Sequence, residues 1–116
     1  METTLSQWPD DPPASTRRIR LLAEAAAAFF DIPLDELKSR KRSNELVWPR
    51  SICMRMARDA GYSSPVIGKW WKREHSSVLH AANLVNDLRE SKPTYETQFR
   101  QFVIFAKKYI HQKDRH

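Results

Sequence analysis

The sequence predicts an all-α domain of about six helices. No stretch alternates between polar and apolar residues, as a half-buried strand does, anywhere in the 116 residues. Apolar residues recur instead at helical spacing, most clearly over 74–90, where one face carries Val78, Ala81 and Val85. Short segments containing proline, glycine or serine separate the predicted helices, which is the pattern of a small helical domain.

Length and composition limit the possible functions. A chain of this length forms one domain with a real core. Lysine and arginine total 20 against 14 aspartate and glutamate, and the net charge of +6 favours a polyanionic partner such as nucleic acid. Two glycines leave no Gly-rich phosphate loop, so we expect no bound nucleotide. The single cysteine, Cys53, allows no intrachain disulfide and no cysteine-based zinc site.

The chain divides into an arm, a helical domain and a tail. Residues 1–14 are rich in proline and aspartate without periodicity, which predicts a flexible arm with Trp8 as its large apolar side chain. The helical domain is expected over 15–112 and a frayed polar tail over 113–116. No apolar run approaches the length of a transmembrane helix, and the acidic start does not resemble a signal peptide. We therefore expect a cytoplasmic, nucleoid-associated protein with no membrane partner and no cofactor.

The first two helices precede a strongly basic segment. A helix is predicted over about 17–30, and a short one follows Pro33, which suits a first helical turn. The cations at the start of the first helix are expected to lie in solvent: Arg17, Arg18 and Arg20. Residues 38–44, hereafter the basic loop, then place four cations in five positions. Such a loop must be exposed; it either lies along phosphates, with an arginine entering a narrow minor groove, or merely adds solubility.

A third helix is predicted over about 49–60, with Pro49 in its first turn. Its apolar side includes Ile52, Cys53 and Met56, while Met54 departs from this pattern. The opposite side carries three arginines that extend the positive surface of the basic loop: Arg50, Arg55 and Arg58. Cys53 is most simply a small buried hydrophobic residue.

The next two helices have the order of a helix-turn-helix motif. Ser64 and Pro65 form an N-cap and first turn of a short helix that ends near Trp71, and a tight break follows. The helix at 74–90 then presents polar side chains from its start: Arg73, Glu74, His75, Ser76 and Ser77. A helix that anchors its body and offers hydrogen-bonding groups at its N-terminus suits a DNA major groove. The alternative is an ordinary amphipathic helix with a polar N-terminus.

The last helix, about 94–112, carries a wide aromatic stripe. Core packing explains the stripe, but Phe105 falls outside it, which leaves a homodimer or a protein partner as an option. The alternative function is therefore a protein-interaction module that binds a replication or transcription factor through Trp8 and this helix.

Catalytic and metal chemistry find little support. Adjacent side chains on a helix diverge, so His75 and Ser76 do not form a nucleophile–base pair. The histidine pairs lie five residues apart, whereas zinc-binding helices usually present ligands four apart. We predict neither an enzyme nor a metal site.

The order of these motifs resembles the C-terminal DNA-binding domain of the bacterial replication initiator DnaA. A basic loop precedes a Pro49-Arg50 helix start, then Pro65-Val66-Ile67-Gly68, then the stretch 73–81, Arg-Glu-His-Ser-Ser-Val-Leu-His-Ala. The family has Gly-Gly-Arg-Asp-His-Thr-Thr-Val-x-His-Ala at the last position. The similarity extends over about 19–105.

The resemblance implies a Trp-repressor-like helix-turn-helix domain that binds double-stranded DNA at short asymmetric sites. It places Arg42 in the minor groove, Arg50 and Arg58 at phosphates or bases, and Pro65 against the backbone. The first turn of the helix at 74–90 would read the major groove. The predicted DNA-binding set is Lys41, Arg42, Arg50, Ser51, Arg58, Pro65, Lys72, Arg73, Glu74, His75, Ser76 and Ser77.

Several features depart from the family. Lys72 stands where the family has Gly-Gly, Glu74 replaces aspartate, and Ser76 replaces threonine and so lacks a methyl group. The last helix is longer than the family's, and no ATPase domain precedes residue 17. We therefore expect a stand-alone regulator of transcription or replication that does not melt an origin itself.

Overall fold

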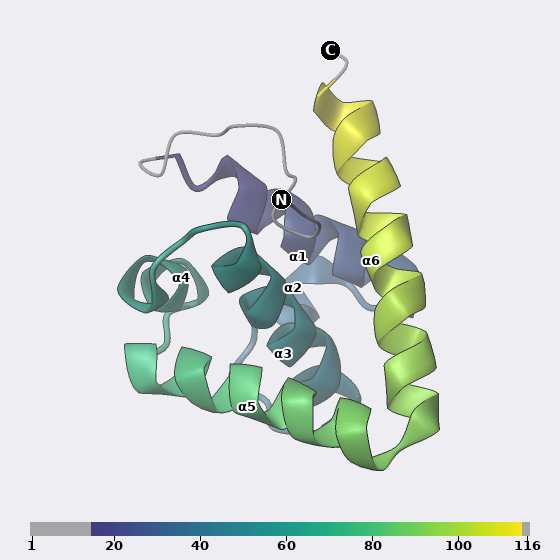
Figure 1. Ribbon diagram of the computed structural model, residues 1–116. Coiled ribbons are helices and arrows are strands. Elements are labelled where there is room, and N and C mark those ends of the chain that lie inside the picture. The colour runs from purple at the N-terminus through teal and green to yellow at the C-terminus, as the bar shows by residue number, and fades with distance from the viewer. Residues whose placement is uncertain (1–14, 115–116) are drawn as a thin grey trace.

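The computed structural model describes residues 15–114, which form six α-helices and no strand. Figure 1 shows their arrangement. The helices are α1 (Arg17–Phe30), α2 (Leu34–Leu37), α3 (Asn44–Asp59), α4 (Ser64–Trp71), α5 (His75–Ser91) and α6 (Pro93–Asp114). The predicted all-α class and the helix count are confirmed. The predicted arm over 1–14, including Trp8, lies outside the described residues.

Helix α3 is the centre of the domain. It packs against α1 on one side and α5 on the other, while α6 stands against α1 and the end of α5 (Figure 1). The core side chains that these helices contribute include Leu22, Ile52, Val78 and Phe102, all fully buried. Cys53 is also buried, and this burial raises the pKa of its thiol well above the usual range, as expected for an inert packing residue.

The central position of α3 explains why it begins five residues before the predicted start. Leu46 and Trp48 are buried, and the Trp48 indole Nε1 donates to Gln98 Oε1 at 2.7 Å. Pro49 lies inside the helix, where it removes the bond to the carbonyl of Glu45. An interior proline costs about 3 kcal/mol, and burying the two large side chains returns about 1.5–3 kcal/mol each. Packing therefore outweighs the proline, and the same central position buries Met54.

The arginines at the start of α1 are not all solvated, so that expectation is wrong for Arg18. Its side chain is 2% exposed, and its Nη2 lies 3.3 Å from Asp114 Oδ2. Arg17 donates to Asp114 Oδ1 at 2.5 Å. Burial pulls the pKa of Asp114 upward, but the hydrogen bond from Arg17 and the charge of Arg18 leave it lowered overall. Asp114 belongs to the segment 113–116, which was predicted to be a frayed tail. The structure corrects this prediction for residues 113 and 114, because α6 continues through Asp114, while 115–116 lie outside the described residues.

Phe105 is not the free apolar side chain of α6. Its ring packs 5.3 Å from that of Phe29 and is stacked on Tyr109 at 6.2 Å. The contact area between α1 and α6 is wider than the aromatic stripe of α6, so Phe105, which lies beside that stripe, still packs against α1. The exposed apolar side chain of α6 is Ile104, at 57%.

Candidate nucleic-acid interface

The helix-turn-helix begins with a cap one residue earlier than predicted. Ser63 is the N-cap of α4, and its Oγ accepts a hydrogen bond from the Val66 backbone N–H at 3.4 Å. Ser64 is the first helical residue, and its buried Oγ accepts from Arg58 Nη1 at 2.5 Å. The Ser64 assignment is therefore wrong. Its hydroxyl ties the exposed Arg58 of α3 to the start of α4, next to the exposed Pro65.

The break between α4 and α5 is made by a lysine and a glycine. Lys72 adopts a left-handed conformation with φ of 60°, and the Arg73 N–H donates to the Gly68 carbonyl at 2.7 Å. A Cβ on Gly68 would lie 2.6 Å from the Arg73 carbonyl oxygen, which is closer than real contacts allow. Gly68 therefore permits α5 to begin directly against α4, and the positive φ of Lys72 replaces the glycine typical of such a turn.

The first turn of α5 faces solvent while its body is anchored. Glu74, His75 and Ser76 are exposed and Ser77 is half-buried, whereas Val78, Ala81 and Val85 are buried. Glu74 is the N-cap residue, but its side chain makes no capping hydrogen bond. The first backbone N–H groups of α5 thus point outward, as at helix N-termini that bind phosphate.

Arg50 does not project outward as the sequence analysis expected. Its side chain is 6% exposed, and its guanidinium donates to three carbonyls of the preceding segment. Nε bonds to Leu37 O at 2.7 Å, Nη1 to Lys41 O at 2.8 Å and Nη2 to Ser39 O at 2.8 Å. In this arrangement Arg50 positions the basic loop. Its neighbour Ser51 is also buried, at the base of a groove described below.

Arg73 attaches the same loop to the helix-turn-helix. Its Nη2 donates to Ser39 O at 2.7 Å and its Nη1 to Trp71 O at 2.8 Å. Two guanidinium groups therefore meet at the Ser39 carbonyl. The pKa of Arg50 is lowered by burial and then by the charge of Arg73, and that of Arg73 by burial and then by Arg40 and Arg42. Like charges are thus held together, an arrangement that a polyanion would stabilise.

The other cations of the basic loop differ in availability. Lys38 Nζ lies over the Trp70 ring at 4.0 Å, and Lys41 Nζ is paired with Glu36 Oε1 at 3.2 Å. Arg40 and Arg42 are exposed and form no hydrogen bond or ion pair within residues 15–114. These two arginines are free to meet phosphates or a groove.

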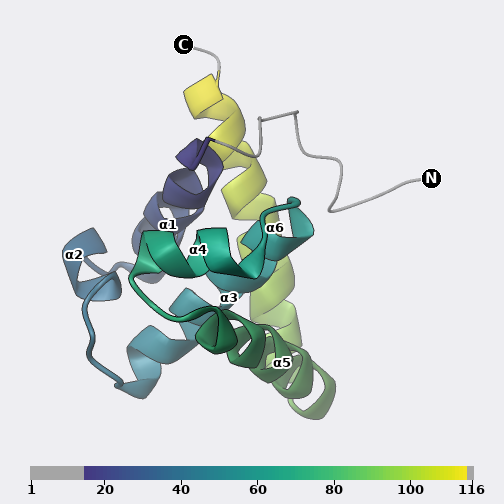
Figure 2. The same cartoon turned by 90° about the vertical axis from the view of Figure 1, so that its left-hand side faces the viewer.

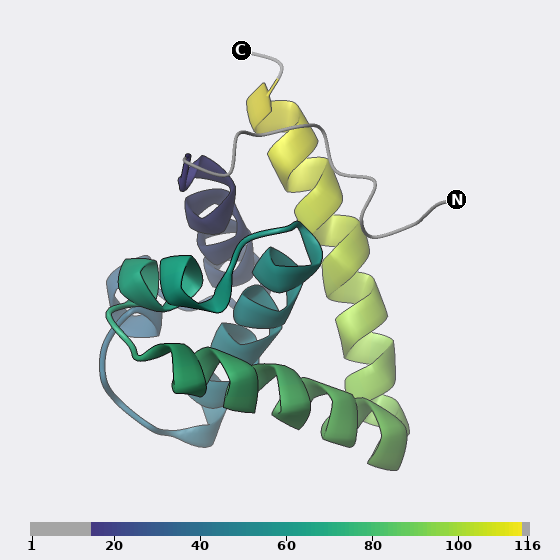
Figure 3. The same ribbon diagram turned by 60° about the vertical axis from the view of Figure 1, so that its left-hand side comes forward.

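A groove of about 530 Å³ lies between α3 and α5, and Arg42 of the basic loop lines it at one end. Figures 2 and 3 show the loop, α4 and the start of α5 at one side of the molecule. The polar lining consists of Arg42, Arg50, Ser51, Arg73, Ser77 and His80, and the apolar lining of Val47, Met54, Ala81 and Leu84. The structure thus brings together five predicted site residues.

The remaining predicted residues lie around this groove or farther away. Lys72, Glu74, His75 and Ser76 cluster at the start of α5, whereas Arg58 and Pro65 lie at the opposite end of α4. Two exposed residues of α5, His80 and Leu79, were not in the predicted set, and of these His80 lines the groove. Their spacing of three or four residues from Ser76 would have placed them on the same face.

Other site types find no geometric basis in the described part. Between residues 15 and 114, no three His, Cys, Asp or Glu side chains are grouped so that they could hold a metal ion. None of the helices there has the length and apolar character needed to cross a membrane.

Comparison with known proteins identifies the family. The model of the bacterial DnaA protein helix-turn-helix matches residues 19–85. The chain is 34% identical over 92 residues to the chromosomal replication initiator protein DnaA of Acinetobacter baumannii (strain AYE), which covers 78% of this chain and 20% of that protein. It is 30% identical over 76 residues to the protein of the same name in Thermoanaerobacter sp. (strain X514), covering 64% and 17%. The chain thus spans about a fifth of the length of these relatives. These matches confirm the resemblance inferred from the sequence motifs.

Proposed function

Because the chain belongs to the bacterial DnaA helix-turn-helix family, a family of DNA-binding domains, we propose that it binds specific sites in double-stranded DNA. The first turn of α5 enters the major groove, and the basic loop follows the backbone with Arg42 in the adjacent minor groove. The proposed role is binding, without a catalytic step or a bound nucleotide, in the cytoplasm at the nucleoid.

One observation carries this proposal: the two DNA-reading elements are joined. Ser39 of the basic loop accepts hydrogen bonds from Arg50 of α3 and from Arg73, the residue just before the N-cap of α5. A loop fixed relative to α5 can contact one groove while the helix lies in the next. Arg40 and Arg42 supply free cations, and His75 and Ser76 supply donors and acceptors for base edges or phosphates.

The recognised sequence is proposed to differ from that of the relatives. Glu74 reaches farther than aspartate and can accept from a cytosine N4 group. Ser76 lacks the methyl group with which threonine could contact a thymine methyl. The chain spans only about a fifth of the length of these relatives, so we propose a role that requires only the occupation of DNA sites. By occupying its sites, the domain regulates transcription or replication.

Selection of bound sequences from random duplex DNA tests the proposal. An enriched motif is expected, and the logarithm of the affinity should fall steeply with the logarithm of salt, by about 0.9 per phosphate contacted. Arg42→Ala should weaken binding and relax a nearby A·T preference, whereas Arg20→Ala, which removes a cation on α1, should not. A flat salt response, or selection without enrichment, would overturn the assignment.

Base reading by α5 has its own test. His75→Ala or Ser76→Ala should cost about 1–3 kcal/mol at the selected site and much less on random DNA. If both variants keep the wild-type ratio of specific to random binding, the first turn of α5 does not read bases.

A further inference from the structure

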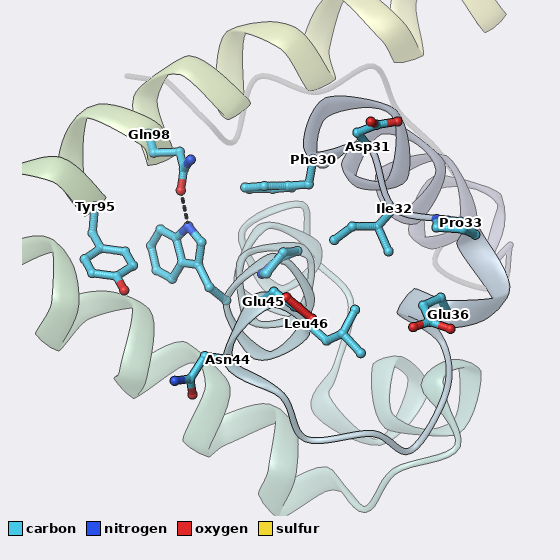
Figure 4. A pocket seen from close by; sticks show the side chains of 12 residues that line it. Phe30, Asp31, Ile32, Pro33, Glu36, Asn44, Glu45, Leu46, Tyr95 and Gln98 are labelled. Atoms are coloured by element: carbon cyan, nitrogen blue, oxygen red, sulfur yellow. Dashed lines mark hydrogen bonds between the residues drawn. The ribbon is translucent and has the colours of Figure 1, made fainter.

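A second hollow lies on a different face, bounded by the α1–α2 turn and by the starts of α3 and α6. It is open to solvent and has a volume of about 620 Å³. Figure 4 shows Phe30 and Ile32 pointing toward its middle and Gln98 at its wall, where the Gln98 Oε1 accepts a hydrogen bond from the Trp48 indole. None of the predicted DNA-binding residues lines it. The hollow is therefore separate from the nucleic-acid interface.

The hollow combines an apolar interior with an acidic rim. Its lining includes the carboxylates Asp31, Glu36 and Glu45 but no lysine or arginine, although the chain has a net charge of +6. Glu36 is paired with Lys41, whereas Asp31 and Glu45 form no ion pair within the described residues. An occupant that suits this surface carries an apolar side chain between cations.

The outer face of α6 has this chemistry. Ile104 is 57% exposed, and Arg100 and Lys108 lie one turn before and one turn after it on the same side of the helix. Arg100 Nε is paired with Glu96 Oε2 at 2.5 Å, but 74% of the Arg100 side chain remains exposed, so its other N–H groups can still meet a second carboxylate. Over residues 15–114 one other large hydrophobic side chain is comparably exposed, Leu79 at 43%, and it belongs to the face of α5 assigned to DNA. The side chains of Arg100, Ile104 and Lys108, hereafter the α6 stripe, thus match the hollow in charge and in apolar character, and they lie outside the face assigned to DNA.

We propose that copies of this chain associate head to tail, with the α6 stripe of one copy in the acidic hollow of the next. Ile104 enters the apolar interior, and the flanking cations face Asp31 and Glu45. The two surfaces are different parts of the same molecule, so the contact is heterologous and leaves one hollow and one stripe open at the ends of the assembly. Copies bound at neighbouring DNA sites would assist one another, because binding to one DNA molecule raises their effective concentration.

Sedimentation velocity on the whole chain tests the contact over a wide concentration range. The wild-type mass should rise with concentration. Ile104→Asp should weaken association about tenfold or more, as expected for a central apolar anchor. Asn44→Lys/Glu45→Lys, which makes the rim of the hollow positive, should do the same. Both sets of positions are exposed, so the circular dichroism spectrum should remain that of the wild type.

Mixing the two variants gives the sharpest result. At a concentration at which the wild type just associates, each variant alone should stay largely monomeric. Together the two variants should form a dimer and nothing larger, because each retains the one surface that the other needs. Leu79→Asp is the matched control, since it places the same charge on the other exposed apolar side chain. A wild type that is monomeric throughout, a mixture that stays monomeric, or an association that Leu79→Asp abolishes and Ile104→Asp does not would each overturn the proposal.

Discussion

Replacing Arg50 separates a positioning role from a direct DNA contact. The guanidinium donates to three carbonyls of 37–41, and two of these come from the basic loop. A lysine at this position keeps the charge but loses the planar fork, and its single ammonium cannot satisfy three diverging acceptors at these positions. We therefore expect Arg50→Lys to loosen the loop even in the absence of DNA.

The hydrogen bonds set the size of the effect. Hydrogen bonds to charged groups contribute about 1.5–3 kcal/mol each, but carbonyls in a partly exposed loop regain water when the donor is lost. Losing two of the three bonds should then lower the free energy of unfolding by about 2–3 kcal/mol. In a domain of this length each kcal/mol corresponds to a change in Tm of about 4–8 °C.

Urea unfolding followed by circular dichroism measures this loss. The midpoint should fall without a change in slope, while Arg42→Lys, at an exposed position of the same loop, should change stability by less than about 0.5 kcal/mol. Specific DNA binding should weaken in Arg50→Lys despite the retained charge. An Arg50→Lys protein with wild-type stability and wild-type affinity would refute the positioning role.

Three further substitutions probe the helix-turn-helix and its support. Gly68→Ala gains about 1 kcal/mol of helix propensity but places a Cβ 2.6 Å from the Arg73 carbonyl oxygen. The net effect should be a loss of about 1–2 kcal/mol of stability, measured by thermal unfolding, and weaker specific binding, measured by titration with DNA. Lys72→Gly relieves the left-handed backbone at this position, so the free protein should be equally stable or more stable by up to about 1 kcal/mol, but DNA binding should weaken because an ammonium that meets a phosphate is lost. Lys72→Asn is the control, because asparagine tolerates this φ and carries no charge. If the salt dependence of binding is unchanged in both variants, Lys72 is not part of the interface. Hydrogen bonds from two arginines of α5 and α6 lower the pKa of Glu96 to about 2, so its contribution to stability is present above its ordinary pKa near 4.5 and is lost as the pH falls through 2. The stability difference between wild type and Glu96→Gln should therefore shrink over that range, and a constant difference would contradict the ion-pair assignment.

Local sequence patterns predicted most of the helices, because periodicity and proline placement act over a few residues. The polar first turn of α5 and its buried face at Val78, Ala81 and Val85 also follow from spacing within one helix. The start of α3 did not, since it depends on the contact between Trp48 and Gln98, 50 residues apart. Arg18 was misjudged for the same reason, because its partner Asp114 lies at the opposite end of the sequence.

The basic loop shows where local reasoning about charge ends. Arg42 and Arg50 both carry a guanidinium group and lie only eight residues apart, so the sequence alone assigns both of them to the DNA-binding surface. Their roles differ because the carbonyls of residues 37, 39 and 41 face α3, where Arg50 is buried, while Arg42 remains in solvent. A helical wheel of α3 places Arg50 correctly on the side of the loop but does not show whether the loop folds over it.

The buried position of Arg50 does not remove its charge from the proposed interface. A charge inside the domain is screened less than a surface charge, and the Debye length at physiological salt is about 8 Å. Arg50 and Arg73 therefore add to the positive potential around Arg40 and Arg42, the two arginines proposed to meet phosphates, although their own donors are bonded to carbonyls. A neutral substitution such as Arg50→Met would lose the clamp and the field together, and its weaker DNA binding would not separate the two. Arg50→Lys keeps the field and removes the clamp, so a loss of affinity in that variant measures how far DNA binding depends on a loop held in place.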